Sequence, residues 1–113
     1  MNIKRGEIWL ANLDPTIGSE IQKTRPVAVV SNNINNTHNN VITILPITSN
    51  TTKVFSFEVL LQKGIANLPK DSKVKADQIR TIDKVRLIKK IGTIPTSYLT
   101  QINAAIQLHL DLV

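Results

Sequence analysis

Short apolar runs separated by polar segments make up most of this chain, and they predict β-strands. The expected strands cover 7–13, 27–30, 41–45, 55–61, 73–79 and a stretch within 88–94. In the fourth of them, Phe55, Phe57 and Val59 fall at every second position, which is typical of a half-buried strand with its aromatic face inward. The same alternation in the fifth strand places Lys73 and Lys75 together on one face.

The spacing of the apolar residues changes after Pro95. Leu99, Ile102 and Ile106 recur at helical spacing, so a C-terminal amphipathic helix is predicted. Thr96 is expected to be its N-cap. A single helical turn is also predicted at 83–87.

Three polar or proline-containing segments separate the first strands. The pair Asp14-Pro15 ends the first strand, and a loop follows to about Thr24. Asparagines crowd 32–40, and because their side chains compete for backbone hydrogen bonds, a loop is predicted there. Pro46 predicts an edge, a bulge or an irregularity at the end of the third strand.

Strands in sequence followed by one helix predict a mainly β, α+β fold. We expect one domain over 1–113, built as a small and strongly bent antiparallel sheet or barrel with a C-terminal helix. No apolar stretch approaches the roughly 20 residues that span a bilayer, and the N-terminus lacks the apolar core of a signal peptide. We therefore expect a soluble, cytoplasmic protein.

Charge and cysteine content narrow the chemistry. Lys and Arg total 14 against 8 Asp and Glu, which gives a net charge of +6 and favours polyanionic partners. Many soluble domains are basic without binding nucleic acid, so charge alone adds little. The chain has no cysteine, which excludes disulfides, thiolate catalysis and sulfur-ligated zinc.

Two strand ends carry the most informative side chains. Arg25 directly precedes Pro26, which restricts it to extended geometry, and its planar guanidinium suits a phosphate. Thr48 and Ser49 follow the third apolar run and offer adjacent hydroxyls. From spacing alone, a surface arginine and ordinary turn chemistry are the simpler interpretations.

Other polar residues leave two interpretations open. Gln78 suits a base edge or a phosphate, or is simply a polar residue on a solvated strand. Glu20 either orients Arg25 or is a solvated loop charge. His38 and His109 do not form a pair at metal-ligand spacing, and the chain has no phosphate-binding glycine loop.

Six short motifs occur in order along most of the chain: RGEIW at 5–9, LDPTIGSE at 13–20, TRP at 24–26, VVSN at 29–32, PITS at 46–49 and DQIRTID at 77–83. Each is weak alone, but together they resemble the MazF/PemK-type toxins of bacterial toxin–antitoxin systems. The resemblance implies a small SH3-like barrel with a C-terminal helix, the fold shared with CcdB-type plasmid maintenance toxins. It also implies a homodimer.

The resemblance further implies an endoribonuclease without cofactor or metal. Relatives cut single-stranded RNA, chiefly mRNA, at short sequences, and leave a 2′,3′-cyclic phosphate and a 5′ hydroxyl. A cognate acidic, MazE-like antitoxin neutralises them. Position by position, Arg25 and Thr48 match the catalytic pair.

The remaining site residues are assigned to RNA binding. The resemblance places Glu20 and Gln78 in substrate handling, and we add three residues that flank the catalytic pair or lie in the same loop: Lys23, Thr24 and Ser49. In this interpretation the guanidinium stabilises the phosphoryl charge and donates or relays a proton to the leaving oxygen. Lysines such as Lys23, Lys53 and Lys73 would follow the RNA backbone.

Two other functions are compatible with the strand pattern. One is a CcdB-like gyrase poison, although those toxins carry a tryptophan near the C-terminus and the single tryptophan here is Trp9. The other is a non-catalytic nucleic-acid-binding module on an SH3-like scaffold. Arg25, Thr48 and Gln78 together favour the ribonuclease.

Overall fold

A computed structural model describes residues 1–112 of the chain. Its strands are β1 (Glu7–Asn12), β2 (Thr24–Val29), β3 (Val41–Thr48), β4 (Glu58–Leu61), β5 (Ser72–Lys75), β6 (Arg80–Asp83) and β7 (Leu87–Thr93). The helices are α1 (Asn33–His38) and α2 (Thr96–His109), with short 3-10 turns η1 (Ile65–Asn67), η2 (Ala76–Gln78) and η3 (Lys84–Arg86). The predicted helical turn at 83–87, the strand within 88–94 and the C-terminal helix are confirmed.

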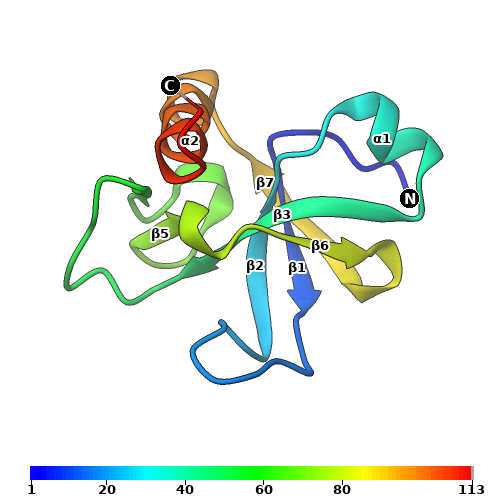
Figure 1. The fold of residues 1–113 in the computed structure, drawn as a ribbon, viewed down its shortest axis with the longest axis horizontal. Helices are drawn as coiled ribbons and strands as arrows, with labels where there is room; N and C mark the ends of the chain where they lie inside the picture. Colours follow the sequence, from blue (N-terminus) through cyan, green and yellow to red (C-terminus); the bar gives the residue numbers. More distant parts are fainter. Residues whose placement is uncertain (113) are drawn as a thin grey trace.

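All strand pairs are antiparallel, and β3 is the strand that holds the sheet together. The order is β4-β5-β3-β2-β1-β7, and β6 also pairs with β3. Ile44 of β3 pairs with β2 on one edge and with β6 on the other, and the end of β3 pairs with β5, so β3 joins three strands (Figure 1). The expected bent antiparallel sheet with a C-terminal helix is confirmed, but among the described residues β4 and β7 do not pair, so the barrel is not closed.

The two faces of β2 and β3 pack into two separate hydrophobic clusters. Ala28 and Leu45 belong to the cluster that includes Ile102 of α2. Val27 and Ile44, one position away on the same strands, belong to the other cluster, together with Trp9, which is 6% exposed. This is the alternation expected of strands buried on both faces. Pro46 lies inside β3, opposite Val27, without ending the strand.

The asparagine-rich segment is not a loop, so that prediction is wrong. Residues Asn33–His38 form α1, and the side chain of Asn32 caps it by accepting a hydrogen bond from the Asn35 backbone N–H at 2.8 Å. Asn36 is buried and donates its amide to the Ser31 carbonyl at 2.9 Å. The asparagines therefore satisfy the ends of a short helix, the role for which their side chains are also suited.

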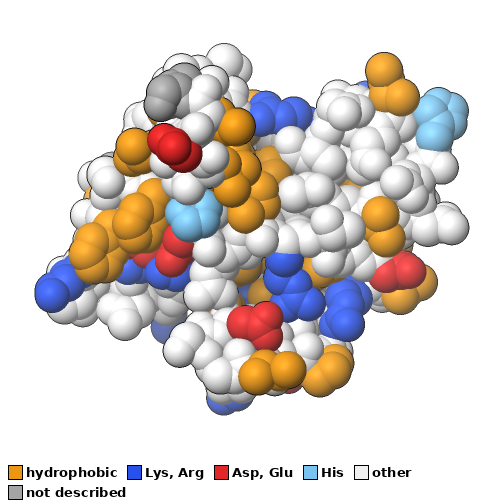
Figure 2. Space-filling model, in the orientation of Figure 1, with side chains coloured by type: hydrophobic (Ala, Val, Ile, Leu, Met, Phe, Trp, Pro, Cys, Tyr) orange, Lys and Arg blue, Asp and Glu red, His pale blue; other side chains and the backbone are white. Residues whose placement is uncertain are grey.

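The aromatic face of segment 55–61 was predicted inward, and for Phe55 this is wrong. β4 begins only at Glu58, and Phe55 is 51% exposed, although Val59 and Leu61 are buried as expected. The rings of Phe55 and Phe57 stack on each other with centroids 5.5 Å apart. The ring of His109 lies beside that of Phe57, with centroids 5.9 Å apart. Figure 2 shows hydrophobic side chains gathered on the side of the molecule that carries α2.

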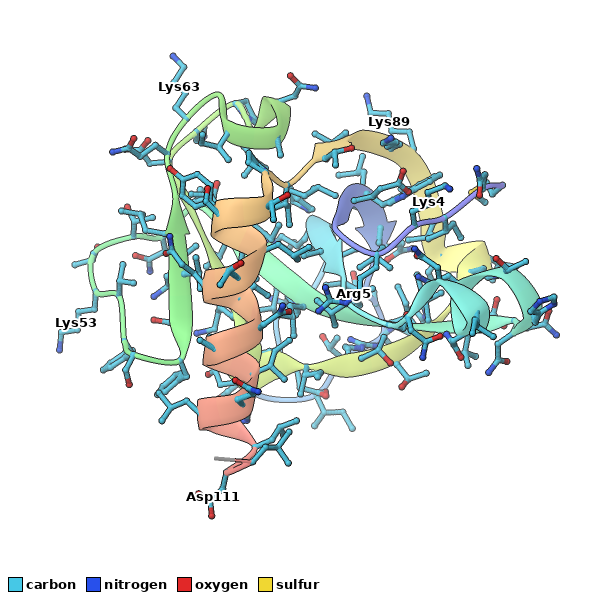
Figure 3. All side chains as sticks on the ribbon, turned by 90° about the horizontal axis from the view of Figure 1, so that it is seen from above. Lys4, Arg5, Lys53, Lys63, Lys89 and Asp111 are labelled. Carbon is cyan, nitrogen blue, oxygen red and sulfur yellow. The ribbon has the colours of Figure 1, made fainter. Side chains whose placement is uncertain are left out.

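Glu58 turns inward because two lysines and a backbone amide meet its carboxylate. Its side chain is fully buried, with Lys75 Nζ at 2.6 Å and Lys73 Nζ at 3.1 Å. The Phe55 backbone N–H donates to it at 2.9 Å, and Lys73 also donates to the Lys53 carbonyl at 2.6 Å. Lys73 is therefore buried inside an ion cluster rather than free to follow an RNA backbone, whereas Lys53 extends into solvent (Figure 3).

The ion cluster predicts how stability depends on pH. Burial raises the pKa of Glu58, but hydrogen bonds from Lys75, Phe55 and Lys73 outweigh it and lower that pKa below its ordinary 4.5. The pKa of Lys75 is raised above 10.5, since its bond to Glu58 and the charge of Asp77 outweigh desolvation. The free energy of unfolding should therefore be level near neutrality and fall as the pH drops below about 4.5. Urea titrations across this range test this, and a curve that rises on acidification would contradict it.

Two further observations concern α2 and the membrane. Thr96 was predicted to be the N-cap of α2, and this is wrong. Thr96 is the first residue of the helix, Pro95 occupies the N-cap position, and no side-chain hydrogen bond caps this end. Neither helix in residues 1–112 has the length and apolar character needed to cross a bilayer.

Candidate active site

The pairing of β2 with β3 places Arg25 beside Thr48. The strands run antiparallel and their pairing ends with Val27 opposite Pro46, so Arg25 and Thr48 each lie two residues beyond this last pair, at the same end of the two strands. Opposite positions on paired strands project from the same face of a sheet. The two strand ends that the sequence singled out therefore meet.

Both residues line one pocket of about 240 Å³. Its walls come from 24–26 on β2, from 47–49 at and just past the end of β3, and from Leu68, Pro69, Lys70 and Ser72 before and within β5. Thr24 and Ser49, which were assigned to RNA binding, are thus in the pocket. Lys70 was missed by sequence reasoning because only the pairing of β5 with β3 brings it there.

A single backbone contact orients the Arg25 guanidinium. Its Nε donates to the Gln22 carbonyl at 3.1 Å. Among the described residues its two terminal nitrogens have no hydrogen-bond partner and the side chain has no ion-pair partner. The fork that suits a phosphate therefore remains available at a half-buried position.

The Thr48 hydroxyl accepts one hydrogen bond and can still donate another. Its oxygen accepts a hydrogen bond from the Asn50 backbone N–H at 3.3 Å. A hydroxyl that accepts in this way can still donate its own hydrogen. The pocket thus combines a guanidinium fork, a hydroxyl donor and the Lys70 ammonium.

Glu20 and Gln78 line a different hollow, of about 360 Å³. The Gln78 oxygen accepts from the Ile21 backbone N–H at 2.9 Å, and its amide donates to the Ser19 carbonyl at 3.1 Å. Glu20 accepts from the Ile17 backbone N–H at 2.6 Å. In this structure both side chains are bound to the β1–β2 loop, residues 13–23, which leads into Arg25, and Lys23 is exposed on the same loop.

A larger hollow, of about 640 Å³, lies elsewhere, between the N-terminal segment, α1 and α2. Arg5 points into this region (Figure 3), but its Nε donates to the Val30 carbonyl at 3.0 Å and its Nη2 to Asn103. Size alone does not identify a site, and the smaller pocket has the unpaired donors. Among residues 1–112, no three His, Cys, Asp or Glu side chains gather closely enough to hold a metal ion.

Comparison with known proteins identifies the family of this chain. Residues 4–110 match the family model of the PemK-like, MazF-like toxins of type II toxin–antitoxin systems. The chain belongs to this toxin family. It is 44% identical to endoribonuclease MazF9 of Mycobacterium tuberculosis over 115 residues, covering 97% of this chain and 98% of that protein. It is 33% identical to endoribonuclease EndoA of Bacillus subtilis, covering 100% and 98%.

Solved toxin structures share the fold. MazF of Deinococcus radiodurans superimposes with a TM-score of 0.85 at 24% identity, over 98% of each chain. A mycobacterial endoribonuclease in complex with its cognate antitoxin gives a TM-score of 0.81, over 98% of this chain and 97% of that one. The family match spans Arg25, Thr48, Glu20 and Gln78, so every candidate site residue of this toxin lies inside the shared region.

Proposed function

We propose that this toxin is an endoribonuclease that cleaves single-stranded RNA, chiefly mRNA, at short sequences in the cytoplasm. The observation that carries the proposal is that Arg25 and Thr48 line one pocket with their donors unpaired. The family membership and the curated relatives, which are endoribonucleases, support it. Glu20, Lys23, Thr24, Ser49 and Gln78 remain the residues proposed to bind substrate.

The reaction uses the nucleophile that RNA itself supplies. The ribose 2′ oxygen attacks the adjacent phosphorus, the bond from phosphorus to the 5′ oxygen breaks, and the products are a 2′,3′-cyclic phosphate and a 5′ hydroxyl. The 2′ proton is taken by water or a phosphate oxygen, because the pocket is lined by neither a carboxylate nor an imidazole among its described residues. The leaving oxygen gains a proton.

In this reaction the pocket mainly stabilises the negative charge of the reacting phosphate. Negative charge accumulates on the phosphoryl oxygens, and fixed donors aimed at it are often the largest catalytic contribution. Arg25 donates hydrogen bonds from its two terminal nitrogens to those oxygens, and the Thr48 hydroxyl donates a third hydrogen bond to them. Arg25 or a water beside it relays the proton to the 5′ oxygen, and the Lys70 ammonium adds a second positive charge at the pocket.

The toxin is further proposed to act as a homodimer that an acidic, MazE-like antitoxin neutralises. Solved relatives include toxin–antitoxin complexes. A net charge of +6 favours encounter with an acidic segment as well as with RNA.

An RNA cleavage assay with analysis of the product ends tests the function. The purified toxin is expected to cut a mixed-sequence single-stranded RNA at full rate in excess EDTA, and to leave cyclic phosphate ends. The same sequence made with 2′-O-methyl ribose should remain intact, since it lacks the nucleophile. Activity that disappears in EDTA and returns with Mg²⁺ would contradict the mechanism, and plasmid cleavage with gyrase but no RNA cleavage would favour the gyrase poison.

A further inference from the structure

The guanidinium of Arg25 is aimed by the loop that precedes it. Its Nε is bound to the Gln22 carbonyl at 3.1 Å, and this contact fixes the plane of the group. If that carbonyl turned away, the guanidinium would lose the one hydrogen bond that orients it at the pocket it lines. The orientation of Gln22 therefore controls where the charge of Arg25 is placed.

The Gln22 carbonyl faces Arg25 because the next residue is in an unfavourable backbone conformation. Lys23 has a φ of 70°, in the left-handed region that residues with a Cβ rarely adopt. This conformation is unfavourable for a residue such as lysine, because its Cβ crowds the following carbonyl oxygen. Something outside Lys23 must therefore hold it there.

Both backbone groups of Lys23 are tied to the other end of the loop. Its N–H donates to Asp14 Oδ1 at 2.9 Å, and its carbonyl accepts from the Leu13 N–H at 2.9 Å. The second bond joins backbone to backbone. The first depends on a side chain, and a carboxylate acceptor makes it one of the stronger kinds of hydrogen bond.

Asp14 is itself held in place from two sides. Its backbone N–H donates to Asn12 Oδ1 at 3.0 Å, and its carbonyl accepts from Arg86 Nη1. Arg80 Nη1 donates to the neighbouring Leu13 carbonyl at 3.3 Å. Arginines from β6 and η3 thus fix the start of the loop, and the hydrogen bond from the Lys23 N–H to the Asp14 carboxylate ties the end of the loop to this fixed start.

We propose that Asp14 is a positioning residue for Arg25, which holds the left-handed turn at Lys23 and thereby keeps the Gln22 carbonyl on the guanidinium. The kinetic part of this inference rests on the proposed ribonuclease function. The structural part does not, because it concerns a hydrogen bond of the free protein.

Kinetics with three variants test the relay. In Asp14→Ala, kcat for RNA cleavage should fall by about 10- to 100-fold with little change in KM, since a small displacement of a charge-stabilising group costs on this order. Asp14→Asn keeps an acceptor oxygen and should recover most of the rate. Asn32→Ala, which removes a side-chain acceptor from a backbone N–H at α1, is the matched control and should cleave normally.

A double variant tests the role of the backbone conformation. Glycine adopts a positive φ without strain, so Asp14→Ala should reduce kcat less in a Lys23→Gly background than in the wild type. The reference for the double variant is Lys23→Gly alone, because that substitution also removes a side chain proposed to bind RNA. If Asp14→Ala fails to fold, Asp14→Ser, whose side chain reaches less far, carries the same expectation. An Asp14→Ala protein that is folded and retains its kcat overturns the relay, and so does an Asp14→Asn variant as slow as Asp14→Ala.

Hydrogen exchange of the Arg25 Nε proton gives a readout without RNA. NMR of the toxin labelled with ¹⁵N-arginine, with the Arg25 signal assigned by its absence in Arg25→Lys, should show slow exchange in the wild type and faster exchange in Asp14→Ala. Equal exchange in both overturns the proposal. If the wild type does not cleave RNA, the proposed function fails while this measurement still decides the role of Asp14.

Discussion

Replacing Arg25 with alanine is expected to leave the toxin folded and to reduce RNA cleavage by about 100- to 1000-fold or more, the usual cost of losing one donor aimed at transition-state charge. The side chain is half-buried, and its single hydrogen bond within residues 1–112 is to the Gln22 carbonyl, so its loss removes little packing. The measurement is kcat on a single-stranded RNA, with circular dichroism to confirm the fold.

Two further substitutions make the Arg25 result specific. Lys63→Ala removes one positive charge from an exposed side chain that does not line the pocket and extends into solvent (Figure 3), and it should cleave at nearly the wild-type rate. Arg25→Lys keeps the charge but loses both the fork and the Nε contact, so it should remain well below the wild type. Near wild-type cleavage by Arg25→Ala would remove the basis of the proposed mechanism.

The largest expected loss of stability comes from Glu58→Ala. The substitution leaves the ammonium groups of Lys73 and Lys75 without their shared carboxylate, and the Phe55 N–H without its acceptor. Breaking a buried ion pair by removing one partner typically costs about 3–5 kcal/mol. Urea unfolding should show a decrease in the free energy of unfolding of this size.

The control for Glu58 is Asp111→Asn, which removes a negative charge from an exposed residue past the end of α2 (Figure 3) and should change stability little. Replacing Lys73 and Lys75 with methionine in the Glu58→Ala background removes the uncompensated charges and should restore part of the loss. A single Glu58→Ala variant as stable as the wild type would show that the cluster does not stabilise the fold.

The proposed catalytic pair was within reach of the sequence because its signals are local. Arg25 directly precedes Pro26, and Thr48 follows an apolar run, so the sequence alone identifies both as candidates. Their meeting depends on the antiparallel register of β2 and β3, which periodicity does not specify. The family motifs supplied that missing relation.

Other parts of the site depend on contacts between distant segments. Lys70 reaches the pocket only because β5 pairs with the end of β3, and no local pattern marks it. From the sequence, an RNA-binding role and a solvated position were equally good interpretations of Gln78. In the structure its side-chain oxygen accepts a hydrogen bond from the β1–β2 loop, 57 residues away in the chain. The α1 helix was missed because asparagine has similar preferences for turns and for helix caps.

Glu58 shows why alternation misled in one segment. A strict pattern of apolar and polar positions puts Glu58 toward solvent and Phe55 inside, the reverse of what the structure has. The two lysines that compensate the carboxylate lie on another strand, so the exchange is invisible until β4 and β5 are paired.

Because β3 contacts three different strands, its length is far less free to change than that of the loops around it. Adding or deleting one residue between Val41 and Thr48 would turn the hydroxyl of Thr48 to the opposite side of the sheet and separate it from Arg25. Segments 13–23 and 49–57 carry no such constraint of register. We therefore expect target preference to diversify during evolution through 49–57 and the middle of 13–23, while Asp14 and Lys23, whose hydrogen bond is proposed to position Arg25, are retained.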